Sequence, residues 1–131
     1  MKPRISETEL IFPELSYKIV GVLFSVHNKL GGGLQERIYY KTIKSAFEEA
    51  NIKYKPQFKV DLNYGDQKIS HYFLVFLVED KIVLEIKSGQ RFKIKDIEQV
   101  YAYLKSTNLK LGILANFAKK YLKFKRIINL H

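Results

Sequence analysis

The sequence predicts an α/β domain in which helices flank a mixed β-sheet, with the element order α-α-β-β-β-α-β. Two observations predict this class. Apolar residues first recur every three or four positions, as in amphipathic helices, and later recur at every second position or in short runs, as in strands. A helical segment near residue 100 then separates two apolar runs, which is typical of a right-handed crossover between parallel strands.

Two helices are predicted in the N-terminal part of the chain. Residues 14–30 show the spacing of an amphipathic helix, and Gly31-Gly32-Gly33 ends it because glycine tolerates the backbone angles of a helix end. A second helix is expected from about residue 34 to 50. The side chains expected to face the core are Leu15, Ile19, Val22, Leu23, Val26 and Leu30 in the first helix and Leu34, Ile38, Ile43, Phe47 and Ala50 in the second.

Three strands are predicted next. Residues 58–64 alternate apolar and polar side chains, as in a strand with one wet face, and Gly65-Asp66 marks a turn. Residues 69–78 are almost wholly apolar, which predicts one long strand covered on both faces. A short polar turn at Glu79-Asp80 leads into a further strand over 81–87.

The C-terminal part predicts a helix and a buried strand. Residues 94–106 are expected to be helical, with Ile97, Val100, Tyr101 and Leu104 on the packing side. Residues 111–117 predict a buried strand, and 124–130 add a last short one. No repeat or linker divides the chain, so residues 1–131 are expected to form a single domain.

The charge is concentrated at the C-terminal end. The chain carries a net charge of +10, and residues 110–131 contain no acidic residue. Such a segment fits either a surface that binds a polyanion such as nucleic acid or a solubilising surface. The candidate nucleic-acid-binding residues are Lys119, Lys120, Lys123, Lys125 and Arg126.

Composition also narrows the class of protein. There is no cysteine, which excludes disulfides and thiolate metal sites and fits a reducing compartment. No apolar run approaches the roughly 20 residues that span a bilayer, and the N-terminus lacks the apolar segment of a signal peptide. We therefore expect a cytoplasmic protein with no membrane partner, and the sequence leaves open whether it forms a homo-oligomer.

The pair Glu85 and Lys87 is the strongest candidate for chemistry. Residues two apart on a strand share a face, so the carboxylate and the ammonium point the same way. A carboxylate can hold a hard divalent cation, and a nearby lysine can stabilise negative charge that develops on a phosphate. Gln99 and Tyr103 follow on one face of the next helix, where they could orient this pair. Taken alone, the pattern also fits a structural ion pair.

The segment 26–39 resembles the V-H-x-x-L-G-x-G-x-x-E-x-x-Y signature of the GxxExxY proteins, a branch of the PD-(D/E)XK nuclease superfamily. Residues 83–87 are similar to the family's V-x-E-[LI]-K strand, and residues 99–105 to its Q-x-x-x-Y-L-K helix. Residues 109–117 resemble its closing strand, which ends in Asn-Phe. The likeness extends over about residues 14–129.

The resemblance implies a restriction-endonuclease-like core that acts on nucleic acid with Mg²⁺. Glu36, Glu85, Lys87 and Gln99 would be the catalytic residues, and Glu36 and Glu85 the metal ligands. His27, Tyr39 and Tyr103 match further positions of the motifs and would support the site.

Two positions depart from the family's pattern. The arginine expected on the preceding strand is replaced by Phe73. The aspartate expected on the preceding strand, ten residues before Glu85, is replaced by Val75. A two-residue turn after that strand would place Leu74 opposite Glu85, and a three-residue turn or bulge would place Val75 there. Neither register supplies an acid, so the Mg²⁺ site is expected to be weakened. The candidate replacements are Asp96, His71 and Asp61.

Two functions therefore remain open from the sequence. One is Mg²⁺-dependent hydrolysis of phosphodiester bonds at a degenerate site. The other is a catalytically inactive nuclease fold that binds nucleic acid or a protein partner. A purely structural domain is the weaker third possibility.

Overall fold

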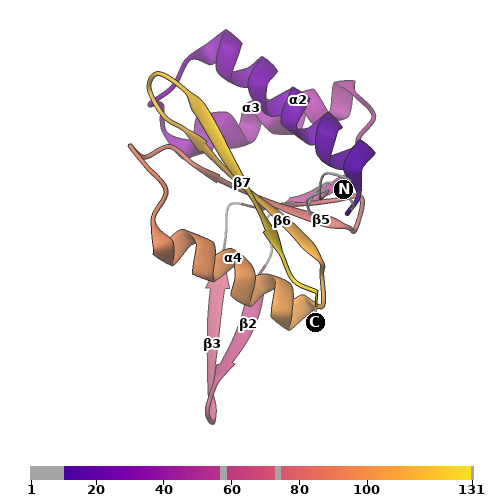
Figure 1. Ribbon diagram of the computed structural model, residues 1–131, viewed down its shortest axis with the longest axis vertical. Coiled ribbons are helices and arrows are strands. Elements are labelled where there is room, and N and C mark those ends of the chain that lie inside the picture. Colours follow the sequence, from indigo (N-terminus) through magenta and orange to yellow (C-terminus); the bar gives the residue numbers. More distant parts are fainter. Residues whose placement is uncertain (1–10, 57–58, 73–74, 131) are drawn as a thin grey trace, which may run out of the picture.

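The chain folds into three layers, with a β-sheet between two helical layers (Figure 1). This computed structural model describes residues 11–56, 59–72 and 75–130, and within 59–72 it describes the side chains only of residues 65–67. The elements are α2 (Pro13–Leu30), α3 (Glu36–Glu49), β1 (Tyr54–Pro56), β2 (Lys59–Tyr64), β3 (Gln67–Tyr72), β4 (Val75–Val78), β5 (Ile82–Lys87), α4 (Ile94–Thr107), β6 (Leu111–Phe117) and β7 (Leu122–Ile128). The α/β class expected from the sequence, a mixed β-sheet flanked by helices, is confirmed.

Five strands form the main sheet in the order β1-β4-β5-β6-β7. The central strands β5 and β6 are parallel, as expected for a strand–helix–strand crossover through α4, and the other pairs are antiparallel. The carboxyl ends of β5 and β6 therefore open at the same edge of the sheet, where ligands bind in many α/β folds.

Helices α2 and α3 cover one face of the sheet. The predicted core positions Ile19, Leu23, Val26, Ile43 and Phe47 are buried there. The expectation was wrong at Leu30, Leu34, Ile38 and Ala50, which are exposed. Because α3 begins at Glu36 instead of residue 34, its buried stripe runs through Tyr39, Ile43 and Phe47.

Helix α4 covers the opposite face. Val100, Tyr103 and Leu104 pack there against Val75, Val83, Leu114 and Ile127. Gly112 makes this close packing possible, because a Cβ at this position would lie 2.6 Å from Cγ1 of Val100.

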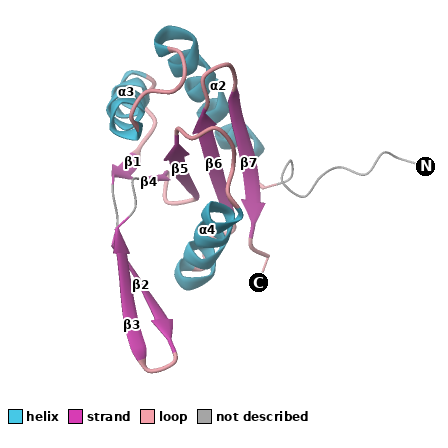
Figure 2. Ribbon diagram, turned by 90° about the vertical axis from the view of Figure 1, so that its left-hand side faces the viewer, coloured by secondary structure: helices cyan, strands magenta, loops and turns pink. Residues whose placement is uncertain are grey.

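The prediction of a single strand over residues 69–78 was wrong. Strand β3 ends at Tyr72 and pairs only with β2, whereas β4 begins at Val75 and belongs to the main sheet. The β2–β3 hairpin projects away from the sheet, past α4 (Figures 1 and 2). A continuous apolar run cannot reveal this break, because apolar composition is the same in two short strands as in one long strand.

Candidate functional site

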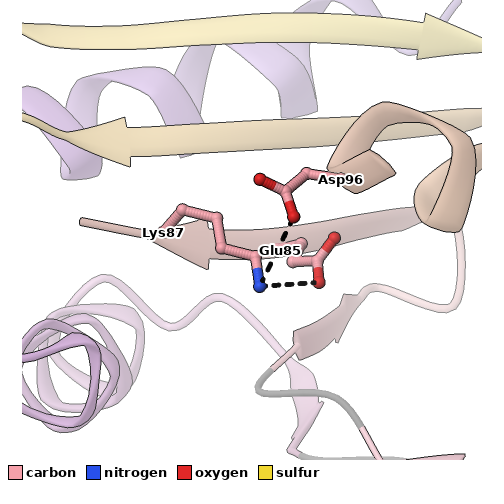
Figure 3. A network of polar contacts seen from close by, with 3 residues as sticks. All are labelled: Glu85, Lys87 and Asp96. Atoms are coloured by element: carbon pink, nitrogen blue, oxygen red, sulfur yellow. Dashed lines mark ion pairs between the residues drawn. The ribbon is translucent and has the colours of Figure 1, made fainter. Parts of the chain in front are cut away.

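Glu85 and Lys87 lie at the carboxyl end of β5, on the face that α4 covers. Leu84 and Ile86 alternate with them along β5 and face the opposite side of the sheet, where they belong to the core formed with α2 and α3. Glu85 is only 3% exposed. The Nζ atom of Lys87 lies 3.8 Å from Oε1 of Glu85 (Figure 3). The predicted common face of the acid and the lysine is therefore present.

Asp96 brings a second carboxylate to the same lysine. Its Oδ1 atom lies 3.8 Å from Nζ of Lys87, and its side chain is 15% exposed. Asp96 is in the first turn of α4, where an acid is favoured by the helix dipole. Figure 3 shows Glu85 on the strand and Asp96 on the helix, with a dashed line from a carboxylate oxygen of each to Nζ of Lys87. Of the three candidate replacements for the missing aspartate, Asp96 therefore lies at the site.

The other two candidates lie on the hairpin. Asp61 is in β2 and His71 in β3, and their side chains are outside the described part of the chain. The premise that His71 shares a strand with Val75 was wrong, because the two residues belong to different sheets.

The protein environment makes Glu85 difficult to ionise. The pKa of Glu85 is raised from 4.5 to about 7, mainly by burial, and the negative charges of Asp96 and Glu36 contribute to the same shift. The positive charge of Lys87 acts in the opposite direction. Burial dominates because the carboxylate loses its hydration inside the sheet–helix interface. A carboxyl group with a pKa near neutrality can change its charge under physiological conditions, which is typical of functional sites.

Val75 occupies the position opposite Glu85. In the antiparallel pair β4–β5, Val75 is the register partner of Glu85, and the three residues Glu79–Lys81 make the turn between the strands. The structure thus has the register that a three-residue turn predicts. Val75, Glu85, Gln99 and Tyr103 line one small recess. Gln99 and Tyr103 therefore lie beside Glu85, as expected from their spacing on α4.

Tyr103 is suited to act as a neutral hydroxyl. Burial raises its pKa to about 12, so the phenol stays protonated at physiological pH. It is 4% exposed and is part of the apolar cluster between α4 and the sheet.

Tyr39 and His27 fix the loop between α2 and α3, residues 31–35, which is called the glycine loop below. The Tyr39 hydroxyl donates to the carbonyl of Gly31 at 2.8 Å and accepts from the amide of Leu34 at 3.0 Å. Its ring stacks on Phe117 with centroids 4.2 Å apart. His27 hydrogen-bonds through Nε2 to the carbonyl of Ala118 at 3.1 Å. These contacts hold the loop against the end of β6.

Glu36 begins α3 directly after this loop. Its side chain is half-buried, and its charge acts on Glu85 across the end of the sheet. The glycine loop therefore positions the first residue of α3 relative to β5.

The five basic residues of the C-terminal segment have different surroundings. Lys119, Lys120 and Lys123 line a pocket of about 400 Å³. Nζ of Lys125 lies 5.5 Å from the centre of the Phe92 ring. Nε of Arg126 donates to the Ser16 hydroxyl on α2 at 3.0 Å. The structure therefore separates Arg126 from the lysines of the pocket.

Asn116 is a site residue that sequence reasoning did not single out. It is the register partner of Lys87 on β6 and is 1% exposed. Its Nδ2 donates to the carbonyl of Gly89 at 3.0 Å, and its Oδ1 has no hydrogen-bond partner among the described residues. The sequence signal for Asn116 was a polar side chain at the end of an otherwise apolar strand. Burying a polar group costs free energy unless it is hydrogen-bonded, so such a residue is a candidate for a structural or functional role.

The described residues do not bring three His, Cys, Asp or Glu side chains together as a metal cluster. In the same part of the chain, no helix has both the length and the apolar character needed to cross a bilayer.

Comparisons with known proteins agree with this architecture. Residues 13–127 match the PD-(D/E)XK nuclease superfamily. A solved structure titled "Crystal structure of SSO0001" superposes with a TM-score of 0.56 at 22% sequence identity, over 72% of this chain and 50% of that one. The chain thus spans about half the length of that protein, and the likeness concerns the fold. A search of curated proteins gave no match.

Proposed function

The chain belongs to the PD-(D/E)XK nuclease superfamily, and from this membership we propose that it hydrolyses phosphodiester bonds of nucleic acid with Mg²⁺. The reaction would take place at the carboxyl end of β5. The observation that carries the proposal is the position of Lys87 Nζ, 3.8 Å from a carboxylate oxygen of both Glu85 and Asp96.

The chemistry of the donor set fits a hard divalent cation. Mg²⁺ in proteins is usually held by one or two carboxylates and completes its coordination with water and substrate phosphate. Glu85 and Asp96 supply two carboxylates. The Oδ1 of Asn116, which has no hydrogen-bond partner among the described residues, is a further oxygen at the same edge of the sheet. When bound, the cation would polarise the phosphate and acidify a water molecule. We propose Glu85 and Asp96 as its ligands, with Glu36 adding negative charge from α3.

The chain's own residues have distinct proposed roles. Glu85 must lose its proton before it can bind a cation, so its raised pKa makes the site sensitive to pH near 7. Lys87 would stabilise negative charge on the phosphate oxygens in the transition state. Gln99 and Tyr103 would keep the Glu85 carboxyl group oriented within the recess that they line.

We further propose that the chain is a cytoplasmic member of the GxxExxY branch. His27, Glu36 and Tyr39 occupy the positions of that signature, and His27 and Tyr39 make the contacts that fix the glycine loop. These contacts give the positions of the signature a structural role, because they connect the start of α3 to the end of β6.

Val75 favours a second candidate function, which is nucleic-acid binding without cleavage. It is 2% exposed and packs in the apolar cluster under α4. The position opposite Glu85 therefore supplies no oxygen ligand, and a Mg²⁺ site with fewer carboxylates binds its ion less tightly. In this case the basic pocket would be retained and the catalytic site would be a remnant.

A cleavage assay separates the two functions. Supercoiled and linear double-stranded DNA, single-stranded DNA and RNA would each be incubated with the protein and Mg²⁺ or Mn²⁺. We expect cleavage that Glu85→Gln and Lys87→Gln each reduce by at least about 100-fold, the usual effect of losing one transition-state contact. Glu98→Gln is the matched control, because Glu98 is exposed on α4.

Each result has a clear meaning. Cleavage by Glu98→Gln but not by Glu85→Gln supports hydrolysis at this site. Salt-sensitive binding without cleavage by the wild type supports the second function. Cleavage that survives both site variants contradicts the proposed assignment of residues.

A further inference from the structure

We propose that the pocket lined by Lys119, Lys120 and Lys123 binds the terminal phosphate of a nucleic-acid strand, so that the substrate is a phosphorylated strand end. This inference rests on the proposed action on nucleic acid and specifies its substrate. The pocket, called the lysine pocket below, has a volume of about 400 Å³ and is also lined by Gly33, Ser88, Gly89, Gln90, Ala118 and Tyr121.

The charge of the lysine pocket matches a phosphate monoester. Three of its lining residues are lysines and none is acidic. Within the described part of the chain, the ion pairs involve other residues, Lys55 with Asp80 and Lys87 with Glu85 and Asp96. Because none of the three lysines pairs with an acid among the described residues, their charges are available to an external anion. A terminal phosphate carries a charge of about −1.5 to −2 near pH 7, whereas an internal phosphodiester carries about −1.

Glycines allow two loops to form one wall of the pocket. The Gly33 amide donates to the carbonyl of Phe117 at 3.0 Å. A Cβ on Gly32 would lie 1.7 Å from the carbonyl oxygen of Ala118, and a Cβ on Gly33 would lie 2.9 Å from Cγ of Lys119. The glycine loop can therefore lie directly against residues 118–119, and any larger residue at position 32 would force the wall apart.

Tyr121 gives the pocket an aromatic edge. Its side chain is 67% exposed although it lines the same pocket as the lysines. An exposed aromatic ring beside cationic groups is the usual arrangement for stacking a base while the phosphate is held by charge. This favours a nucleotide at a strand end over an isolated inorganic phosphate.

Asn116 connects the lysine pocket to the proposed catalytic site. Its amide holds the carbonyl of Gly89, a residue of the pocket wall, and its register partners are Lys87 on one side and Lys123 on the other. Neighbouring strands lie roughly 5 Å apart, so Lys87 and Lys123 are separated by about two strand spacings. A strand whose end phosphate enters the pocket would place its first linkages near Glu85.

Competition binding in EDTA tests the inference without cleavage. An internally labelled single strand would be displaced by unlabelled strands with a 5′-phosphate, a 3′-phosphate or two hydroxyl ends, and by a nucleoside monophosphate. We expect one of the two phosphorylated ends to bind about tenfold more tightly than the hydroxyl ends, as one charge-assisted contact predicts. The preference should disappear in the triple variant that combines Lys119→Gln, Lys120→Gln and Lys123→Gln. It should persist in Lys110→Gln, which removes an exposed lysine at the opposite end of β6.

Two results would overturn the inference. The first is equal affinity for phosphorylated and hydroxyl ends, or a preference that survives in a folded triple variant. The second is a nucleoside monophosphate that competes as well as the phosphorylated strand, which would assign the pocket to a free nucleotide. End preference without cleavage would contradict only the proposed hydrolysis, and cleavage without end preference would contradict only the lysine pocket.

Discussion

Val75 lies directly opposite Glu85 in the antiparallel pair of β4 and β5, with its side chain buried in the cluster under α4. We expect Val75→Asp to place a third carboxylate beside Glu85 and Asp96. Without divalent ions the variant should lose on the order of 3 kcal/mol of stability, because the new charge is buried among other negative groups. Mg²⁺ should restore part of this loss, since a ligand that binds only the folded state stabilises it.

Thermal unfolding with and without Mg²⁺ measures this effect. Val75→Asn is the matched control, because asparagine has a volume and polarity similar to those of aspartate but carries no charge. A melting temperature of the Val75→Asp protein that does not depend on Mg²⁺ would show that position 75 does not face a cation site.

Stability should depend on pH through Glu85. Its pKa is raised to about 7 in the folded protein from 4.5, so between these values the folded state binds a proton that the unfolded state has lost. The free energy of unfolding should therefore fall as the pH rises from about 4.5 to about 7 and level off above it. The contribution is up to about 3 kcal/mol, from about 1.4 kcal/mol for each pKa unit.

Glu85→Gln removes this titration and keeps the shape of the side chain. Denaturant unfolding at several pH values should show the wild type losing stability relative to the variant across this interval. Parallel pH dependences of the two proteins would mean that Glu85 ionises at its ordinary pKa.

The contact between Gly32 and Ala118 predicts a sharp steric effect. In Gly32→Ala the new Cβ would overlap a backbone oxygen, so the glycine loop must move away from the end of β6. We expect a loss of at least about 2 kcal/mol, as for other strongly overpacked positions. The control is Gly21→Ala, because a Cβ there meets nothing within 4 Å in a helix interior. That change should stabilise the protein by about 0.5–1 kcal/mol.

The Tyr39 hydroxyl is predicted to stabilise the glycine loop independently of its ring. Tyr39→Phe keeps the stacking on Phe117 but leaves the Gly31 carbonyl and the Leu34 amide without this partner. The expected loss of stability is about 1–3 kcal/mol. Tyr121→Phe is the control, because Tyr121 is largely exposed. Equal unfolding free energies for Tyr39→Phe and the wild type would contradict a role of these hydrogen bonds.

Much of the fold could be predicted because its elements have strong local patterns. The strand over 111–117 and the start of the helix at Ile94 were predicted at the residues where they occur. On the inward face of α3, Ile43 and Phe47 were predicted correctly, but the first buried position was predicted at Ile38 instead of Tyr39. Tyr39 carries a polar hydroxyl, and only the folded glycine loop shows that this hydroxyl can be buried with its hydrogen bonds made.

The candidate site was predicted less completely because it depends on contacts between distant segments. The common face of Glu85 and Lys87 follows from strand geometry alone. The approach of Asp96 depends on how α4 crosses the sheet, and the role of Asn116 depends on its neighbour across the parallel pair. Neither relationship is present in any short stretch of sequence.

The position of β7 at the end of the sheet has one further consequence. The unpaired backbone N–H and C=O groups of an edge strand can form hydrogen bonds with a strand of another molecule. Repeated pairing of this kind leads to aggregates and fibres. Lys123 and Lys125 are exposed on this strand, and like charges on two such strands would repel each other. Replacing both with threonine would therefore favour self-association of the folded protein, even with the rest of the sheet intact.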